Sequence, residues 1–335
     1  SSRANSKGLD LMMRSTLNAL EDLQVSSSND KPLEAKVLGN AHKNNAQTAS
    51  VQTIHPVLSP SNGHMIGRTL WAEITDVQAA YQAAQNAWPT WEACAVTTRA
   101  DILRKAADLL EARMLEYLPL LAREAGKTLP DGVAEVREAV DFLRYYALQA
   151  EQLMTPTTLP APTGESNVLS LRGRGVWVCI SPWNFPLAIF AGQIAAALVT
   201  GNCVIAKPAE QTPLVAHRFI ELMYEAGVPT DVLFCLPGDG EVGAALTHHP
   251  LCAGVAFTGS TQVARLIAQG LAAKEGPLAP LIAETGGINA MIVDSTALPE
   301  QVIDAVVLSA FRSAGQRCSA LRVLCLQSEI ADELI

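Results

Sequence analysis

The sequence has 335 residues, of which 49% are hydrophobic and 17% charged, so it can bury a core and is not disordered in composition. Its net charge of −9 comes from interspersed acidic and basic residues, which excludes the basic face that a nucleic-acid partner needs. Seven cysteines without a CxxC pair, and the adjacent His248 and His249, favour neither a metal site nor a disulfide framework. No signal peptide or bilayer-spanning run is visible, so we expect a soluble, cytoplasmic chain of about two domains.

The first half of the sequence is mainly helical in pattern. Apolar residues at helical spacing predict a first helix over 7–23, and an irregular linker follows over 25–54. Three longer helices are expected from Asp76 to Pro89, over 97–128 with Gly126 as the terminator, and over 133–154. A stretch rich in proline and threonine, 155–166, then breaks the helical pattern.

From residue 175 onward, short apolar runs rich in β-branched residues alternate with helical segments. The strands are predicted at 175–180, 202–208, 232–237, 254–260, 278–284 and 289–293. The helices between them are predicted at 188–201, 212–226, 241–247 and 261–271. This alternation is typical of an α/β fold with a covered parallel sheet, which binds ligands at the carboxyl ends of its strands.

Three turns that follow predicted strands are candidates for nucleotide binding. GDGEVG (238–243) matches G-x-G-x-x-G, but Phe257 and Thr258 occupy the place of the expected acidic residue, so we do not interpret it as the pyrophosphate site. FTGSTQVA (257–264) places the hydroxyl of Ser260 at a helix start, which suits either a phosphate or an ordinary helix cap.

The third turn is KPAEQTP (207–213), which places Lys207 and Glu210 at the end of a predicted strand. A carboxylate can accept hydrogen bonds from ribose hydroxyls, and an ammonium can donate to the same sugar or to a phosphate. An exposed ion pair on a loop explains the same two residues. The local sequence leaves both interpretations open.

Five short motifs occur in an order and spacing that resembles the aldehyde dehydrogenase superfamily, over roughly Val51 to the last residue. They are SPWNFP (181–186), KPAEQTP, FTGS (257–260), ETGG (284–287) and GQRCS (315–319). GQRCSALR, GGINAMIVDS and REAVDFLRYYA are similar to its glutamate-semialdehyde (pyrroline-5-carboxylate) dehydrogenase branch.

This resemblance implies an aldehyde dehydrogenase-like α/β fold with two domains. A Rossmann-type, parallel-sheet NAD-binding domain would span 51–285, with 155–173 as an oligomerisation flap. The start of an α/β catalytic domain would occupy 286–335, and residues 1–50 would form an N-terminal helix and linker.

The resemblance also implies catalysis by a thiol. Cys318 would be the nucleophile, because a thiolate attacks an aldehyde carbon and the resulting thioester remains hydrolysable. Glu284 would be the general base for that hydrolysis, since a partly buried carboxylate can have its pKa raised towards neutrality. Asn184 and the backbone N–H of Cys318 would stabilise the oxyanion. Taken alone, Cys318 would more often be a buried core thiol.

NAD is the cofactor that the resemblance implies. Lys207 and Glu210 would hold the adenosine ribose, and a carboxylate there favours NAD over NADP. Ser260 would contact the pyrophosphate, while Thr258 and Gly259 would lie near the nicotinamide. Further contacts are expected from the SPWNFP loop, the glycine-rich turn beside the adenine and the ETGG motif, namely Ile180, Ser181, Pro182, Trp183, Gly240 and Gly286.

The implied reaction is oxidation of L-glutamate γ-semialdehyde to L-glutamate in proline catabolism. Ser319 would bind the carboxylate of this aldehyde and Glu138 its amino group, with Phe185 beside the substrate. Glu138 equally fits a solvated carboxylate on a helix. Two alternatives stay open: another small acidic aldehyde, such as succinate semialdehyde, and a catalytically inactive NAD-binding module.

The ends of the sequence suggest partners. RANSKGLDL (3–11) resembles the junction before the dehydrogenase domain of bifunctional proline-utilisation proteins, so an upstream proline dehydrogenase domain is an expected partner. Superfamily members normally continue well beyond their cysteine, whereas this sequence ends 17 residues after Cys318. We therefore expect an incomplete catalytic domain here, and a homo-oligomer for a full-length enzyme.

Overall fold

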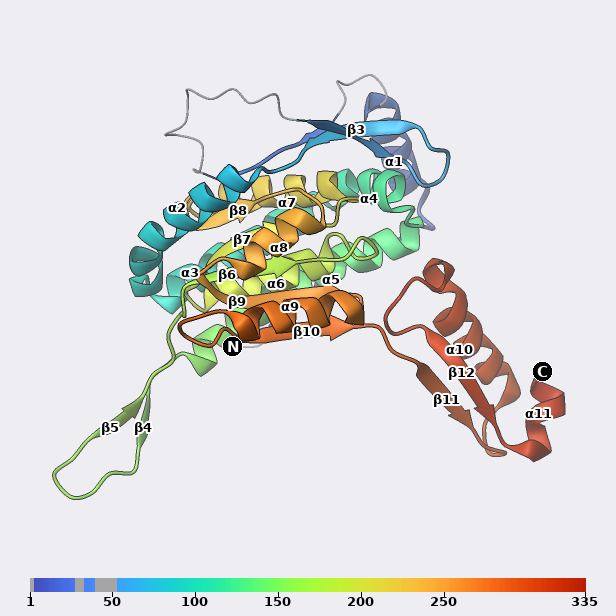
Figure 1. Ribbon diagram of the computed structural model, residues 1–335. Coiled ribbons are helices and arrows are strands. Elements are labelled where there is room, and N and C mark those ends of the chain that lie inside the picture. The colour runs from blue at the N-terminus through green and yellow to red at the C-terminus, as the bar shows by residue number, and fades with distance from the viewer. Residues whose placement is uncertain (1–2, 28–32, 40–52) are drawn as a thin grey trace.

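The computed structural model describes residues 3–27, 33–39 and 53–335, and Figure 1 shows how their elements are arranged. A five-stranded parallel sheet forms the centre, in the order β10-β9-β6-β7-β8. Its strands are β6 Val176–Ile180, β7 Cys203–Lys207, β8 Leu233–Cys235, β9 Cys252–Gly259 and β10 Leu281–Thr285. The prediction of an α/β fold with a parallel sheet is confirmed.

Helices connect these strands and cover the sheet. They are α6 Ala188–Val199, α7 Pro213–Ala226, α8 Gly240–His248 and α9 Thr261–Ala273. Strand β7 is buried along its whole length, as expected for a strand covered on both faces. The sheet also buries four thiols, which here act as small apolar side chains: Cys179, Cys203, Cys235 and Cys252.

The order of strands in the sheet reverses at β6. Strands β7 and β8 lie on one side of β6, whereas β9 and β10 lie on its other side. Val178 of β6 is paired with Ile205 of β7 and with Val255 of β9. The carboxyl ends of β6 and β9 therefore border a crevice, which is where open parallel sheets bind ligands.

Four helices from the first half of the chain form a further layer. They are α2 Ile74–Ala93, α3 Val96–Ala112, α4 Met114–Ala125 and α5 Leu129–Leu153. Helix α3 packs on α6 and α7, α4 packs on α7 and α5 packs on α6, while α2 packs on β6, β7 and α8. Gly126 ends α4 in a left-handed conformation (φ 66°), which confirms the predicted terminator. Across the described ranges, no helix is long and apolar enough to cross a membrane.

Three predicted helix boundaries in this layer are wrong. Helix α5 begins at Leu129 rather than at residue 133, because Thr128 caps it and accepts from the N–H of Asp131. Helix α2 continues past Pro89 to Ala93, because tertiary contacts hold its last turn: the buried Trp91 donates from Nε1 to the carbonyl oxygen of Leu198 (3.1 Å). The segment expected as one helix over 97–128 divides at Arg113 (φ −101°, ψ 17°). This break lets the apolar side of α4 pack against α5.

The N-terminal segment also departs from its prediction. Helix α1 spans Arg14–Ser27 and begins later than the predicted residue 7. Before it, the backbone N–H of Ser6 donates to Asp141 Oδ1 (2.8 Å) and that of Lys7 donates to Glu111 Oε1. These bonds to α3 and α5 hold the chain in a non-helical path.

The predicted linker over 25–54 is only partly irregular. Its residues Leu33–Ala35 form β1, which pairs with β3 (Met65–Leu70), and β3 also pairs with β2 (Ile54–Leu58). Strand β1 is short and gains its partner from a distant part of the chain, so local composition could not predict it. Residues 28–32 and 40–52 lie outside the described residues.

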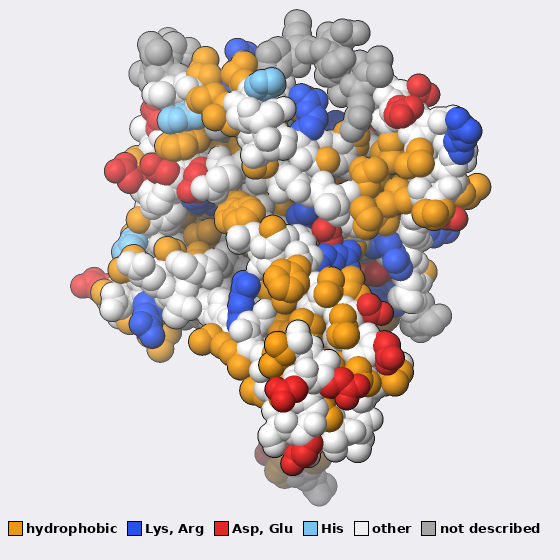
Figure 2. Space-filling view, turned by 90° about the vertical axis from the view of Figure 1, so that its right-hand side faces the viewer, with side chains coloured by type: hydrophobic (Ala, Val, Ile, Leu, Met, Phe, Trp, Pro, Cys, Tyr) orange, Lys and Arg blue, Asp and Glu red, His pale blue; other side chains and the backbone are white. Residues whose placement is uncertain are grey.

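Two parts project from the body in Figure 1. Strands β4 Thr157–Leu159 and β5 Asn167–Leu169 form an exposed antiparallel hairpin within the predicted flap. The second part, which we term the C-terminal lobe (residues 286–335), contains β11 Asn289–Val293, α10 Pro299–Phe311, the 3₁₀ helix η2 Arg312–Gly315, β12 Leu321–Leu326 and α11 Ser328–Leu334. Figure 2 shows apolar and acidic side chains together on the outer face of this lobe.

Glu124, near the end of α4, supports the start of α7. Its buried carboxylate accepts hydrogen bonds from the backbone N–H groups of Leu214 (2.6 Å) and Val215 (2.9 Å). Helix α7 follows directly after the turn that carries Lys207 and Glu210. Burial raises the pKa of Glu124 to about 8, against the two amide bonds, which lower it.

We predict that Glu124 makes stability fall with rising pH. Its folded-state pKa exceeds the ordinary value of 4.5, so its contribution is complete below pH 4.5 and is lost as the pH rises through about 8. Relative to Glu124→Gln, the free energy of unfolding of the wild type should fall by up to about 1.4 kcal/mol per pH unit in this window. Urea unfolding at several pH values measures the difference, and parallel curves for the two proteins would contradict it.

Candidate active site

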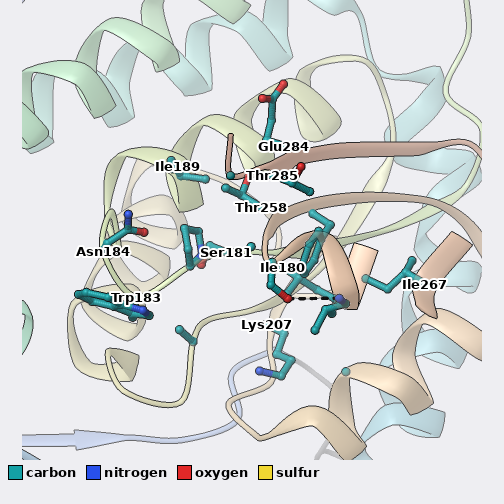
Figure 3. A pocket seen from close by; sticks show the side chains of 18 of the residues that line it. Ile180, Ser181, Trp183, Asn184, Ile189, Lys207, Thr258, Ile267, Glu284 and Thr285 are labelled. Carbon is teal, nitrogen blue, oxygen red and sulfur yellow. Dashed lines mark hydrogen bonds between the residues drawn. The ribbon is translucent and has the colours of Figure 1, made fainter. Parts of the chain in front are cut away.

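A cleft of about 690 Å³ opens at the carboxyl ends of β6, β7, β9 and β10 (Figure 3). Its walls bring together all of the predicted catalytic and cofactor residues: Cys318, Glu284, Asn184, Ile180, Ser181, Pro182, Trp183, Lys207, Glu210, Gly240, Thr258, Gly259, Ser260 and Gly286. These residues come from four strand ends, two helix starts and the C-terminal lobe. Their roles stay predictions, whereas their shared location is a property of the fold.

The loop after β6 forms one wall of the cleft. Trp183 lies at its rim with 42% of its surface exposed. The side-chain amide of Asn184 donates from Nδ2 to the backbone carbonyl oxygen of Gln316 (2.9 Å). This bond ties the loop to the C-terminal lobe two residues before Cys318.

The segment before Cys318 has an unusual backbone. Ser313, Ala314 and Gly315 all have positive φ angles, of 53°, 52° and 68°. A Cβ at Gly315 would lie 2.9 Å from the carbonyl oxygen of Ala310, so this position requires glycine. Arg322, which lines the cleft, donates to the carbonyl oxygen of Gly315 (2.7 Å) and holds the turn.

Asn289, at the start of β11, holds the backbone of the nucleophile and of the residues that follow it. Its Nδ2 donates to the carbonyl oxygens of Cys318 (2.7 Å) and Ala320 (3.0 Å). The side chain of Cys318 is exposed to solvent in the cleft. The sequence offered no signal for Asn289, because its partner lies 29 residues further along the chain.

Glu284 occupies the carboxyl end of β10, where it is paired with Thr258 of β9. In Figure 3 its carboxylate points away from Lys207. The side chain is exposed, which differs from the expected partly buried base. The physical reason is that β10 is an edge strand, with β9 as its only partner in the described part of the chain.

Lys207 and Glu210 form an unequal pair at the end of β7. Lys207 is only 5% exposed, and its Nζ donates to the carbonyl oxygen of Pro208 (3.1 Å) and lies 3.8 Å from Glu210 Oε2. Burial lowers the pKa of Lys207, while the negative charges of Glu210 and Asp239 raise it. The buried ammonium excludes the interpretation of a fully solvated surface pair.

Two helix N-termini face the cleft, and they differ in charge. Helix α8 is capped by Asp239, whose carboxylate accepts from the N–H groups of Glu241 (2.9 Å) and Val242 (3.4 Å). Helix α9 is capped by the neutral hydroxyl of Ser260, which accepts from the N–H of Val263 (3.2 Å). An anion is repelled at α8 and attracted at α9, which supports the sequence-based choice of FTGS over GDGEVG.

Gln193 of α6 joins the two strands at the switch point, and sequence reasoning missed it. Its Nε2 donates to the carbonyl oxygen of Ile180 (3.2 Å) and to Thr258 Oγ1 (3.0 Å), at the ends of β6 and β9. The sequence feature that could have indicated it is that Gln193 is the single polar side chain in the otherwise apolar helix AIFAGQIAAALV.

The three predicted substrate residues lie outside the cleft walls. Phe185 is 8% exposed, and its ring lies 4.0 Å from Lys127 Nζ and 5.3 Å from the Arg317 guanidinium carbon. Ser319 and Glu138 are exposed. Partial desolvation and the neighbouring carboxylate of Glu135 raise the pKa of Glu138, while Arg317 lowers it. Arg317 lines the cleft and so connects it to this group, whose substrate role stays a prediction.

The environments of the cysteines predict their reactivity. Cys318 and Cys325 are exposed, whereas the four cysteines of the central sheet are buried. In the native protein, iodoacetamide should therefore modify Cys318 and Cys325 first, and should reach Cys203 or Cys235 only after unfolding. Peptide mass spectrometry over time measures this order, with a urea-unfolded sample as the control. Equal rates at Cys203 and Cys318 would contradict the prediction.

Many known proteins are similar to this chain, including the following three. "Bifunctional protein PutA" of Klebsiella aerogenes is 48% identical over 340 residues, covering 100% of this chain and 24% of that protein. The "1-pyrroline-5-carboxylate dehydrogenase" of Geobacillus thermodenitrificans is 37% identical, covering 98% and 63%. The crystal structure of the Thermus 1-pyrroline-5-carboxylate dehydrogenase with bound NAD has a TM-score of 0.94 and 32% identity, covering 100% and 65%.

The chain spans about a quarter of the length of the first relative and less than two thirds of the other two. Residues 46–335 match the sequence model of the aldehyde dehydrogenase family. This range includes every strand of the central sheet and every residue that lines the cleft. The chain therefore belongs to the aldehyde dehydrogenase family.

Proposed function

We propose that this chain carries the NAD site and the nucleophile of an L-glutamate γ-semialdehyde dehydrogenase, which oxidises its aldehyde to L-glutamate in proline catabolism. The observation that carries the proposal is the joint placement of Cys318, Asn184 and Glu284 in one cleft at the switch point of a parallel sheet. The relatives named as 1-pyrroline-5-carboxylate dehydrogenases support the choice of substrate.

The cleft fits NAD in size and in chemistry. Its volume of about 690 Å³ lies within the range of roughly 300–1,000 Å³ that is usual for ligand pockets. Within the described residues, the buried Oγ of Ser181 has no hydrogen-bond partner, so a polar group of a ligand would satisfy it. The α9 N-terminus suits the pyrophosphate, and Lys207 and Glu210 suit the adenosine ribose. NAD, when bound, supplies the hydride acceptor.

Three side chains of the cleft would carry out the successive steps of the reaction. The Cys318 thiolate attacks the aldehyde carbon and forms a thiohemiacetal, whose negative oxygen needs hydrogen-bond donors. The Asn184 amide has two N–H groups, and the bond to Gln316 uses one of them. After oxidation to the thioester, Glu284 accepts a proton from the attacking water, and L-glutamate and the thiol are released.

Further proposals concern the surroundings of the enzyme. We propose that residues 155–173 serve as an oligomerisation flap in a homo-oligomer, since both strands of this hairpin are exposed. An upstream proline dehydrogenase domain is supported by the relative named as bifunctional and by the exposed side chains of Met12 and Met13 before α1. We propose that the enzyme acts in the cytoplasm.

The activity is tested by following NADH formation with pyrroline-5-carboxylate and, separately, with succinate semialdehyde. We expect the first substrate to be preferred, Cys318→Ala to abolish turnover, and Asn184→Ala to lower kcat on the order of 10²–10³-fold. Cys325→Ala is the matched control, because Cys325 is also exposed but does not line the cleft. If the folded protein binds NAD but oxidises no aldehyde, the proposed activity is wrong and the chain is a nucleotide-binding module.

Cofactor choice gives a separate test. The carboxylate of Glu210 would repel the 2′-phosphate of NADP, so Glu210→Gln should tighten NADP binding, and it should weaken NAD binding because an amide oxygen is a poorer acceptor for the ribose hydroxyls. Glu241→Gln is the control, since this exposed carboxylate lies in α8 and does not line the cleft. Titration of both cofactors by tryptophan fluorescence measures the ratio of affinities. An equal effect of the two substitutions would refute the ribose assignment.

A further inference from the structure

A buried carboxylate lies behind the loop that carries Asn184. Glu135 of α5 is 1% exposed, and its Oε1 accepts hydrogen bonds from the backbone N–H groups of Leu187 (2.9 Å) and Ala188 (3.3 Å). These are the first amides of α6, which have no acceptor within their own helix. Glu135 therefore fixes the point at which the SPWNFP loop becomes a helix.

The second oxygen of the same carboxylate binds a cation. Glu135 Oε2 lies 3.0 Å from Lys127 Nζ, and both side chains are almost completely buried. The ammonium of Lys127 also contacts the ring of Phe185, two residues before Leu187. Glu135 thus binds the end of the loop at Leu187 and Ala188, and Lys127 contacts the loop at Phe185.

These contacts converge on the proposed oxyanion donor. Asn184 lies between the rim residue Trp183 and the anchored Phe185, and its amide contacts the carbonyl oxygen of Gln316. The ring of Phe185 also faces Arg317, the residue before the nucleophile. Any shift of the ring or of the α6 start would therefore move the amide relative to Cys318.

We propose that Glu135 and Lys127 form a positioning pair that sets the Asn184 amide against the Cys318 segment; this inference rests on the proposed function. Neither residue lines the cleft, so neither is a catalytic residue. Oxyanion stabilisation depends steeply on the placement of its donors, and a displacement of about 1 Å can cost on the order of 100-fold in rate.

The test compares two double variants. The acceptor-retaining variant, Lys127→Met with Glu135→Gln, removes the charges but keeps an acceptor for the α6 amides. The acceptor-free variant, Lys127→Met with Glu135→Leu, removes the charges and the acceptor, and replacing both partners avoids an unpaired buried ion. Arg104→Met with Glu151→Leu is the control, because it removes an ion pair between α3 and α5 that does not line the cleft.

Positioning predicts a specific order of effects. The acceptor-free variant should lower kcat on the order of 10- to 100-fold with little change in the NAD dissociation constant, and the acceptor-retaining variant should recover a large part of that loss. The control should keep wild-type kcat. If kcat falls only in proportion to the folded fraction, or falls equally in all three double variants, the pair is merely structural and the proposal is wrong.

Two readouts do not depend on turnover. Hydrogen exchange at the amides of Leu187 and Ala188 should accelerate in the acceptor-free variant more than in the acceptor-retaining variant. The rate of Cys318 alkylation should change in the same order, because Phe185 and Asn184 both contact its segment. Unchanged exchange and alkylation would overturn the positioning role. If wild-type protein oxidises no aldehyde yet these readouts respond, the proposed function fails while the positioning pair stands.

Discussion

The whole arrangement depends on the double pairing of β6. A parallel strand cannot be joined to its neighbour by a tight turn, so each connection crosses the sheet and returns through a helix. Because β7 follows on one side and β9 arrives on the other, the strand ends at Ile180, Lys207 and Thr258 meet around one crevice. The site residues come from remote parts of the sequence, and only this sheet order brings them together.

A second constraint is the need of buried helix starts for hydrogen-bond acceptors. The loop after β6 and the turn after β7 each lead into a helix whose first amides lie in the interior. Glu135 and Glu124, both from the outer helical layer, accept from those amides. A carboxyl group has two oxygens that can accept hydrogen bonds from two neighbouring N–H groups at once, and each bond is electrostatically stronger in the interior than in water. The helical layer thus contributes to the site without contributing a residue to its walls.

Much of the fold was predictable, since the strand and helix periods of the second half are regular and uninterrupted. Errors arose where a distant contact overrides the local signal. Pro89 does not end its helix because Trp91 is anchored to α6, and Leu33–Ala35 becomes a strand only because β3 is its neighbour. The residues of the cleft followed from the resemblance that five motifs in order carry, because single residues such as Cys318 left a structural interpretation open.

The supporting residues could not be found in this way. Gln193, Asn289 and Glu135 act through backbone atoms 13 or more residues away, and no short motif encodes such a partner. The exposure of Glu284 was equally hidden, because it depends on which strand occupies the sheet edge. The sequence motifs therefore indicate the reacting side chains, but they do not indicate the residues whose hydrogen bonds position those side chains.

The contact of two cations with one aromatic ring has an energetic consequence. Phe185 offers its ring to Lys127 and to Arg317, which approach from different parts of the chain. An aliphatic residue at position 185 would fill the space but would give neither cation a negative face to bind. Loss of the ring would therefore weaken both contacts at once, which couples the three side chains energetically although they lie at positions 127, 185 and 317 of the sequence.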